Sequence, residues 1–134
     1  ESVFSRVKLI NQEVSGGVER LQRILIFVLA FAEKNPGMSC LLVGGALSGE
    51  KPKIRQRAAH FFERLETELR QVLREAEIRE QKKPRLTGAS AASLLAINIE
   101  GRIHQYVRTE FKSAPTKGWS GHWPVLASSL FQTA

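Results

Sequence analysis

The sequence has no aspartate, and it has only one cysteine, one methionine and one tyrosine. All thirteen acidic residues are therefore glutamates, so the most common Mg²⁺ ligand and the usual third member of a catalytic triad are absent. Cys40 has no internal partner for a disulfide, and no Asn-x-Ser/Thr sequon occurs, which indicates a reducing, cytoplasmic setting. The longest apolar run, Ile24–Ala32, has nine residues and is too short for the ~20 that a membrane span needs.

Side chains that carry chemistry are scattered along the chain. The three histidines, His60, His104 and His122, fall in separate predicted elements without Cys or Asp partners at metal-binding spacing. The glycine-rich stretch 44–49 lacks the Gly-Lys-Ser/Thr ending of a phosphate-binding loop. The stretch 118–121 reads Gly-Trp-Ser-Gly, which places the second glycine one position too early for a nucleophile elbow. We therefore expect no enzyme activity, no cofactor and no metal.

Hydrophobic periodicity predicts one all-α domain of about six helices. With 134 residues, the chain has the length of a single domain with one core. Helical spacing of apolar residues continues through most of the sequence, and no alternating strand pattern occurs. The predicted helices cover residues 3–14, 18–34, 37–47, 51 to about 76, 90–112 and 120 to the end. The second is apolar on nearly all sides and is expected in the middle of the domain, and Asn35-Pro36 is expected to cap and begin the third.

The net charge of +7 is concentrated in one segment. Residues 51–85 hold eleven Lys and Arg against six Glu, and the two signs alternate at helical spacing. This pattern is typical of a solvated helix face with ion pairs along it. The alternative is a surface that follows the phosphates of a nucleic acid.

Residues of the last two predicted helices indicate a dimer. The first of the two carries small residues that allow close approach of a neighbouring helix, and the second carries apolar residues that need cover. These residues are Ala92, Ala96 and Gly101, and Trp123, Leu126 and Leu130. We expect the two helices to pair with their symmetry mates in a four-helix interface, because a two-fold homodimer is the most common closed arrangement.

Three segments are similar to one known family in their order and spacing. They are Glu33-Lys-Asn-Pro-Gly37, residues 62–75 (Phe-Glu-Arg-Leu-Glu-Thr-Glu-Leu-Arg-Gln-Val-Leu-Arg-Glu) and residues 101–112 (Gly-Arg-Ile-His-Gln-Tyr-Val-Arg-Thr-Glu-Phe-Lys), the last followed by Pro115-Thr116. With these segments the chain resembles the C-terminal domain of the SlmA family, the nucleoid-occlusion factors among the TetR-type regulators of γ-proteobacteria. The resemblance covers essentially all of residues 1–134.

The resemblance implies a fold and a function. The fold is a TetR-type C-terminal regulatory domain whose last helices build a homodimer. An N-terminal helix-turn-helix domain, expected outside this chain, binds specific chromosomal sites, so the protein is cytoplasmic and associated with the nucleoid. The C-terminal domain binds the C-terminal tail of the division GTPase FtsZ and antagonises FtsZ polymers, so that no septum forms over the chromosome.

The resemblance also implies where the FtsZ tail binds, beside the two helices that open the chain. Arg6 and Asn35 match the family as they stand, whereas Lys34 replaces Arg, Phe27 replaces Leu and Ala30 replaces Gly. Lysine keeps the charge but loses the planar fork of arginine, and alanine narrows the groove by a methyl group. The alternative for Phe27 is packing in the core, and for Arg6 and Lys34 it is a solvated charge.

A second function is compatible with the same residues. In a TetR-type repressor that senses a small hydrophobic ligand, the apolar second helix would line a pocket together with Phe27, Phe31, Phe61 and Trp119. A ligand sensor needs a sizeable cavity with a few convergent polar groups. A partner-binding domain needs a filled core and a groove on its surface.

Overall fold

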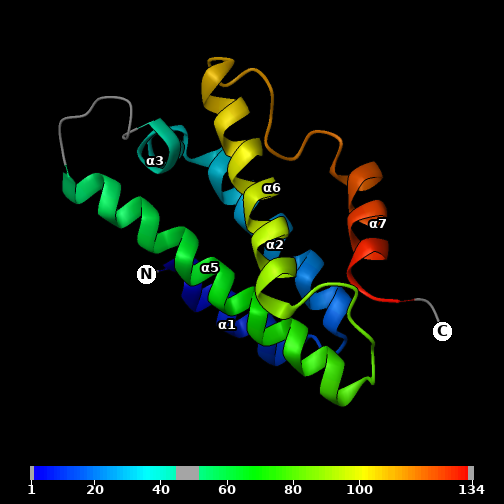
Figure 1. Cartoon of the computed structure of the whole chain (residues 1–134). Helices are drawn as coiled ribbons and strands as arrows, with labels where there is room; N and C mark the ends of the chain where they lie inside the picture. The colour runs from blue at the N-terminus through cyan, green and yellow to red at the C-terminus, as the bar shows by residue number, and fades with distance from the viewer. Residues whose placement is uncertain (1, 45–51, 133–134) are drawn as a thin grey trace.

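The computed structural model describes residues 2–44 and 52–132 and confirms the all-α prediction (Figure 1). Within these residues there is no β-strand, only an isolated bridge between Pro84 and Phe131. The elements, in chain order, are α1 (Ser2–Glu13), α2 (Gly17–Lys34), α3 (Pro36–Ser39), the π-helix η1 (Cys40–Gly44), α5 (Pro52–Arg79), α6 (Gly88–Arg108) and α7 (Trp119–Leu130).

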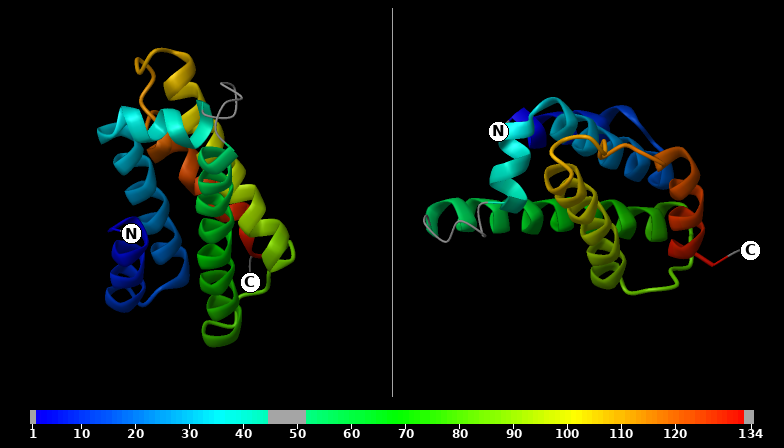
Figure 2. Two further views of the ribbon diagram at one scale, coloured as in Figure 1. Left: turned by 90° about the vertical axis from the view of Figure 1, so that its left-hand side faces the viewer. Right: turned by 90° about the horizontal axis from the view of Figure 1, so that it is seen from above.

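Helix α2 lies in the middle of the domain, as its sequence predicted. It contacts α1, α3, α5 and α6, and the views in Figures 1 and 2 show these helices around it. Its buried apolar residues are Leu21, Ile24, Leu25, Val28, Leu29 and Ala32. Burial of each large apolar side chain stabilises the fold by about 1.5–3 kcal/mol before entropy is counted, so α2 contributes a large share of the hydrophobic core together with α5 and α6.

The beginning of α2 is held close to the second half of α5. A Cβ atom on Gly17 would lie 2.6 Å from the Cβ of Ala76, so only glycine fits at this contact. The amide of Gly17 donates a hydrogen bond to Glu80 Oε2 at 2.7 Å. These contacts fix the point at which the α1–α2 connection turns back over α5.

A partly buried ion pair, which local sequence spacing does not predict, joins the same two helices. Arg20 is only 5% exposed, and its Nη1 donates to Glu75 Oε1 at 2.7 Å. Gln71 donates a further hydrogen bond to the other carboxylate oxygen at 3.0 Å. The hydrogen bond from Arg20, followed by that from Gln71, lowers the pKa of Glu75 below its ordinary value.

The end of α6 differs from the sequence expectation. Helix α6 ends at Arg108 rather than at Lys112, because Glu110 and Phe111 adopt φ angles of +57° and +66° that no helix can continue. Phe111, which the predicted helix 90–112 included, is 41% exposed and packs edge-to-face with Tyr106, their ring centroids 5.1 Å apart.

The third predicted helix differs from the expectation in its type along the described residues. It is divided into α3 and η1, which ends at Gly44, and the remainder of the predicted range 37–47 lies outside the described residues. Asn35 stands at the N-cap position, but its side chain makes no capping hydrogen bond to α3. Instead, its Nδ2 donates back to the carbonyl of Phe31 in α2 at 2.8 Å.

No single helix among the described residues is long and apolar enough to cross a membrane. Helix α2 and the segment Pro36–Val43 reach that length and composition only together, and they are bent by 107° at the break between them. Nearly half of the residues of α2 are buried within the domain, as expected for a core helix.

Candidate functional site

A groove of about 480 Å³ runs between α1 and α2 on the surface of the domain, and we call it the α1–α2 groove. Its apolar lining consists of Ile10, Val14, Ile26 and Phe27. Its polar and charged lining consists of Arg6, Glu13, Glu19, Gln22 and Arg23. Because Glu13 ends α1 and Glu19 lies near the start of α2, the two carboxylates lie at the end of the groove nearest the α1–α2 connection.

Two of the five residues predicted for partner binding line this groove. Arg6 reaches it from α1, where its side chain is exposed, and Phe27 reaches it from α2. Phe27 is half-buried and packs against the core, with its ring centroid 6.5 Å from that of Phe31. One side of the Phe27 ring therefore meets the core, and the other meets the groove.

The other three predicted residues lie farther along α2 and do not line the groove. Ala30 is half-buried, and Lys34 and Asn35 are exposed at the end of the helix. Phe27, Ala30 and Lys34 follow one another at spacings of three and four, so they share one face of α2. From Phe27 to Lys34 the helix rises about 10 Å. By this spacing, the groove and this face of α2 follow one another along the helix as one strip, which ends at Lys34.

The far end of this strip is fixed to the last part of the chain. Tyr106 Oη in α6 donates to the carbonyl of Glu33 at 2.7 Å. Thr116 Oγ1, in the α6–α7 connection, donates to the carboxylate of Glu33 at 2.8 Å. These bonds hold the backbone beside Lys34 and direct the neighbouring carboxylate toward Thr116.

Sequence reasoning missed a second cation in the groove. Arg23 stands four residues before Phe27 and thus on the same face of α2, a spacing that could have identified it. It pairs with Glu19 at 3.1 Å, and both side chains are more than half exposed. An exposed i,i+4 pair contributes only about 0.3–0.5 kcal/mol, so Arg23 can exchange this partner for another carboxylate at little cost.

The structure buries several of the residues predicted for the dimer interface within the chain itself. These are Ala92, Ala96, Trp123 and Leu130. Trp123 stacks on Trp119 with ring centroids 5.5 Å apart. Leu126 is half-buried. Gly101 is exposed, and an added Cβ would meet no atom within 4 Å.

Other apolar residues on α6 and α7 remain exposed. Ile97 is 63% exposed and Val125 is 69% exposed, and Leu94 is also open to solvent. Leu94, Ile97 and Gly101 follow at spacings of three and four and so lie on one face of α6. Exposed aliphatic side chains on two adjacent helices are typical of a surface that another protein covers.

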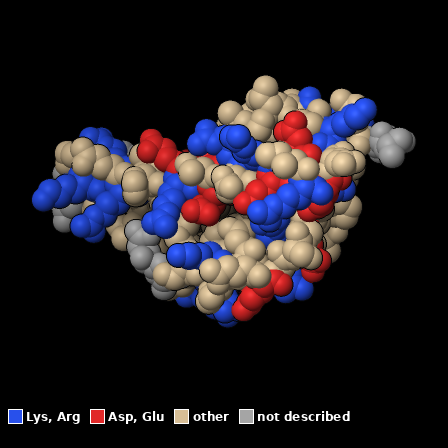
Figure 3. All heavy atoms as spheres, turned by 90° about the horizontal axis from the view of Figure 1, so that it is seen from below, with Lys and Arg blue, Asp and Glu red and all other residues tan. Residues whose placement is uncertain are grey.

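The four aromatic residues of the ligand-sensor alternative do not line one cavity. A hollow of about 870 Å³ between the start of α1, the α3–η1 segment and the start of α5 includes Phe31 and Phe61. Phe27 opens instead into the α1–α2 groove, and Trp119 lies under the guanidinium of Arg102, 5.2 Å from its ring centroid. The hollow is open to solvent, and Lys and Arg side chains gather beside it at the start of α5 (Figure 3).

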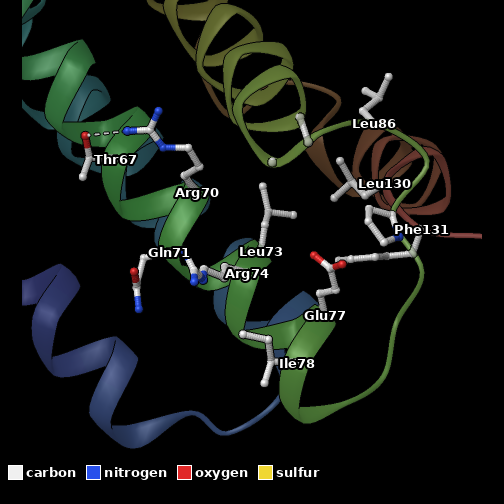
Figure 4. Close-up of a pocket in the computed structure, with 13 residues that line it drawn as sticks. Thr67, Arg70, Gln71, Leu73, Arg74, Glu77, Ile78, Leu86, Leu130 and Phe131 are labelled. Atoms are coloured by element: carbon white, nitrogen blue, oxygen red, sulfur yellow. Dashed lines mark hydrogen bonds between the residues drawn. The ribbon is translucent and has the colours of Figure 1, made fainter.

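A third hollow, of about 610 Å³, lies between the second half of α5, the segment that leads into α6 and the end of α7 (Figure 4). Arg70 bounds it on one side, and the carboxylate of Glu77 and the ring of Phe131 point into it. Its charges are mixed, and none of the residues predicted for partner binding lines it. Within residues 2–44 and 52–132, no three His, Cys or Glu side chains gather as a metal site would require.

Comparisons of the sequence with a family model and with known proteins identify the same family. Residues 16–131 match the SlmA-like family described as "Tetracyclin repressor-like, C-terminal domain". Over 131 residues the chain is 44% identical to the "Nucleoid occlusion factor SlmA" of Marinobacter nauticus, covering 98% of this chain and 67% of the relative. It is 45% identical over 130 residues to the protein of the same name from a Marinomonas species, covering 97% of the chain and 66% of the relative. The chain thus spans about two thirds of the length of these relatives.

Proposed function

The chain belongs to the SlmA-like family of tetracycline-repressor-type C-terminal domains, and on this premise we propose that residues 1–134 form the dimerisation and partner-binding domain of a nucleoid-occlusion factor. In this proposal the dimer binds the C-terminal tail of FtsZ and antagonises FtsZ polymers. A helix-turn-helix domain outside this chain places the dimer on specific chromosomal sites. The domain acts by binding and catalyses no reaction.

The α1–α2 groove is the observation that supports FtsZ-tail binding best. An extended peptide along it would meet aliphatic side chains and the ring of Phe27 in the middle. The cations Arg6 and Arg23 stand beside that middle part, and Lys34 follows on the same face of α2. A tail that alternates apolar and acidic residues complements the part of the groove away from Glu13 and Glu19, whose carboxylates would repel its acidic residues, because charge complementarity steers a partner and fixes its register.

The proposed homodimer forms through α6 and α7. Of the residues named from the sequence, Gly101 and Leu126 retain accessible surface, and Leu94, Ile97 and Val125 extend it. Gly101 would let a partner helix approach closely, since no side chain of its own chain fills that space. Ala92, Ala96, Trp123 and Leu130 support the same interface from beneath, because they hold α6 and α7 against the core.

The ligand-sensor function receives less support from the structure. A sensor requires its aromatic residues around one enclosed cavity with convergent polar groups. Here Phe27, Phe61 and Trp119 face three different surroundings.

Titration of a fluorescently labelled FtsZ-tail peptide against the chain tests the proposal. Arg6→Glu or Lys34→Glu replaces an attraction by a repulsion, a change of about 1–3 kcal/mol, so each variant should bind about tenfold more weakly. Both should remain dimeric and helical, because both side chains are exposed. The matched control is Arg79→Glu at the far end of α5, which should bind within about twofold of the unaltered chain. Equal affinity of all three variants for the peptide would refute the α1–α2 groove as the binding site. If the unaltered chain does not bind the peptide, the proposed FtsZ-binding function is wrong.

A further inference from the structure

The charge of α5 is divided between its two ends. From Pro52 to Phe62 the helix has Lys53, Arg55 and Arg57 and no carboxylate, whereas residues 63–80 hold six Glu against four Arg. We call the three cations the basic end of α5. The charge of this helix is therefore not the even alternation that the sequence pattern indicated.

All three cations of the basic end are free to meet a partner. Each is exposed, and none forms an ion pair with another described residue. Lys53 and Arg57 are four residues apart and both line the 870 Å³ hollow, while Arg55 points to the opposite side of the helix. Figures 1 and 2 show that this end of α5 projects beyond α2 and α6, and Figure 3 shows Lys and Arg side chains gathered on it.

We propose that the basic end of α5 contacts the phosphate backbone of duplex DNA, so that this domain itself adds to the DNA affinity of the protein. The inference rests on the proposed function insofar as the whole protein works on the chromosome. The end of α5 presents cations on two sides of the helix, and DNA is a polyanion whose phosphates repeat along its length, so several phosphates can be contacted at once. A membrane surface would require apolar side chains that project together with the cations. Met38 and Leu41 are exposed nearby, but they belong to the α3–η1 segment in the wall of the hollow and not to the projecting end of α5.

The number of cations sets the expected salt dependence. A protein that neutralises three phosphates has a slope of about −2.7 in a plot of log affinity against log salt concentration. Between about 50 and 200 mM salt, the affinity of this end for any duplex should therefore fall about 40-fold. Contacts to phosphates carry no sequence information, so the effect should be the same for unrelated duplexes.

Two triple variants of the 134-residue chain test the inference, measured by fluorescence anisotropy with a labelled duplex of arbitrary sequence. Lys53→Gln, Arg55→Gln and Arg57→Gln together should weaken binding about tenfold or more at low salt and reduce the slope by about 2.7. The control, Arg70→Gln, Arg74→Gln and Arg79→Gln, removes the same charge from the same helix and should bind within about twofold. Far-ultraviolet circular dichroism checks that both remain helical.

Each alternative outcome would overturn the inference. Equal loss in the two triple variants would mean that only net charge matters, and no loss in the first would mean that DNA binds elsewhere. Tighter binding to phosphatidylcholine–phosphatidylglycerol vesicles than to the duplex at equal phosphate concentration, lost in the first variant, would identify a membrane surface instead. The FtsZ-tail titration is a separate readout. If the unaltered chain does not bind the FtsZ-tail peptide but the two triple variants bind the duplex as expected, the tail-binding function is wrong and the inference about DNA is supported.

Discussion

Replacement of Glu75 by glutamine should destabilise the fold far more than an ordinary substitution on a helix surface. The variant keeps the shape of the side chain but leaves Arg20 without its counter-ion. Removal of one partner of a fully buried pair costs about 3–5 kcal/mol. Arg20 is 5% exposed, but Glu75 is 23% exposed, so water screens part of the interaction. We therefore expect the free energy of unfolding to fall by about 2–3 kcal/mol.

The loss should depend on pH in a defined direction. The hydrogen bond from Arg20, followed by that from Gln71, lowers the pKa of Glu75 below its ordinary value of 4.5. The ionised carboxylate is therefore favoured in the folded state, and its contribution is complete above about pH 4.5. As the pH falls through the lowered pKa, the folded carboxylate takes up a proton and the contribution is lost. The difference between the unaltered chain and Glu75→Gln should thus shrink on acidification.

Urea unfolding at fixed protein concentration, at about pH 7 and at about pH 3, measures both effects. Glu77→Gln is the matched control, because Glu77 lies on the same helix, is exposed and pairs with no described cation. It should change the free energy of unfolding by no more than about 0.5 kcal/mol. A cost for Glu75→Gln as small as that of the control would refute the reasoning, as would a difference that grows on acidification.

Two further predictions concern packing and assembly. Gly17→Ala should lower the free energy of unfolding by about 1–3 kcal/mol, because the new methyl group would lie 2.6 Å from Ala76 Cβ. Gly37→Ala, where an added Cβ meets nothing within 4 Å, should leave the urea midpoint nearly unchanged, and equal midpoints for the two variants would contradict the close approach. Ile97→Glu on α6 should shift the chain from dimer to monomer in sedimentation, because a charge in an apolar two-fold interface is repeated in both subunits. The control Ile78→Glu on α5, at a position that is 64% exposed, should remain a dimer. If the Ile97→Glu variant is still a dimer, the interface does not include this face of α6.

The sequence predicted the elements of the fold because hydrophobic periodicity is local. The helical spacing of apolar residues along α2, α5 and α6 could be identified without knowledge of the neighbouring helices. The end of α6 depended on the left-handed backbone at Glu110 and Phe111, which propensity does not indicate for these residue types. The pair between Arg20 and Glu75 joins residues 55 positions apart, so no spacing rule could identify it.

The candidate site was predictable only in part, for a related reason. Periodicity assigns a residue to a face of its helix, but it does not say whether that face meets the same chain or another. Ala92 and Ala96 were accordingly expected at the dimer interface, and the structure buries them within one chain. Arg6 and Phe27 came from the family resemblance, and the groove between α1 and α2 then identified Arg23 as their neighbour.

The most direct test of the central claim is a two-dimensional ¹H–¹⁵N NMR titration of the labelled chain with an unlabelled FtsZ-tail peptide. If the tail lies in the α1–α2 groove, the backbone amides of Arg6, Ile10 and Phe27 should shift with one common saturation curve. The amides of Met38 and Ile54, which line the hollow at the start of α5, should remain in place. The opposite pattern, or no shift at saturating peptide, would contradict the assignment of the groove as the FtsZ-binding site.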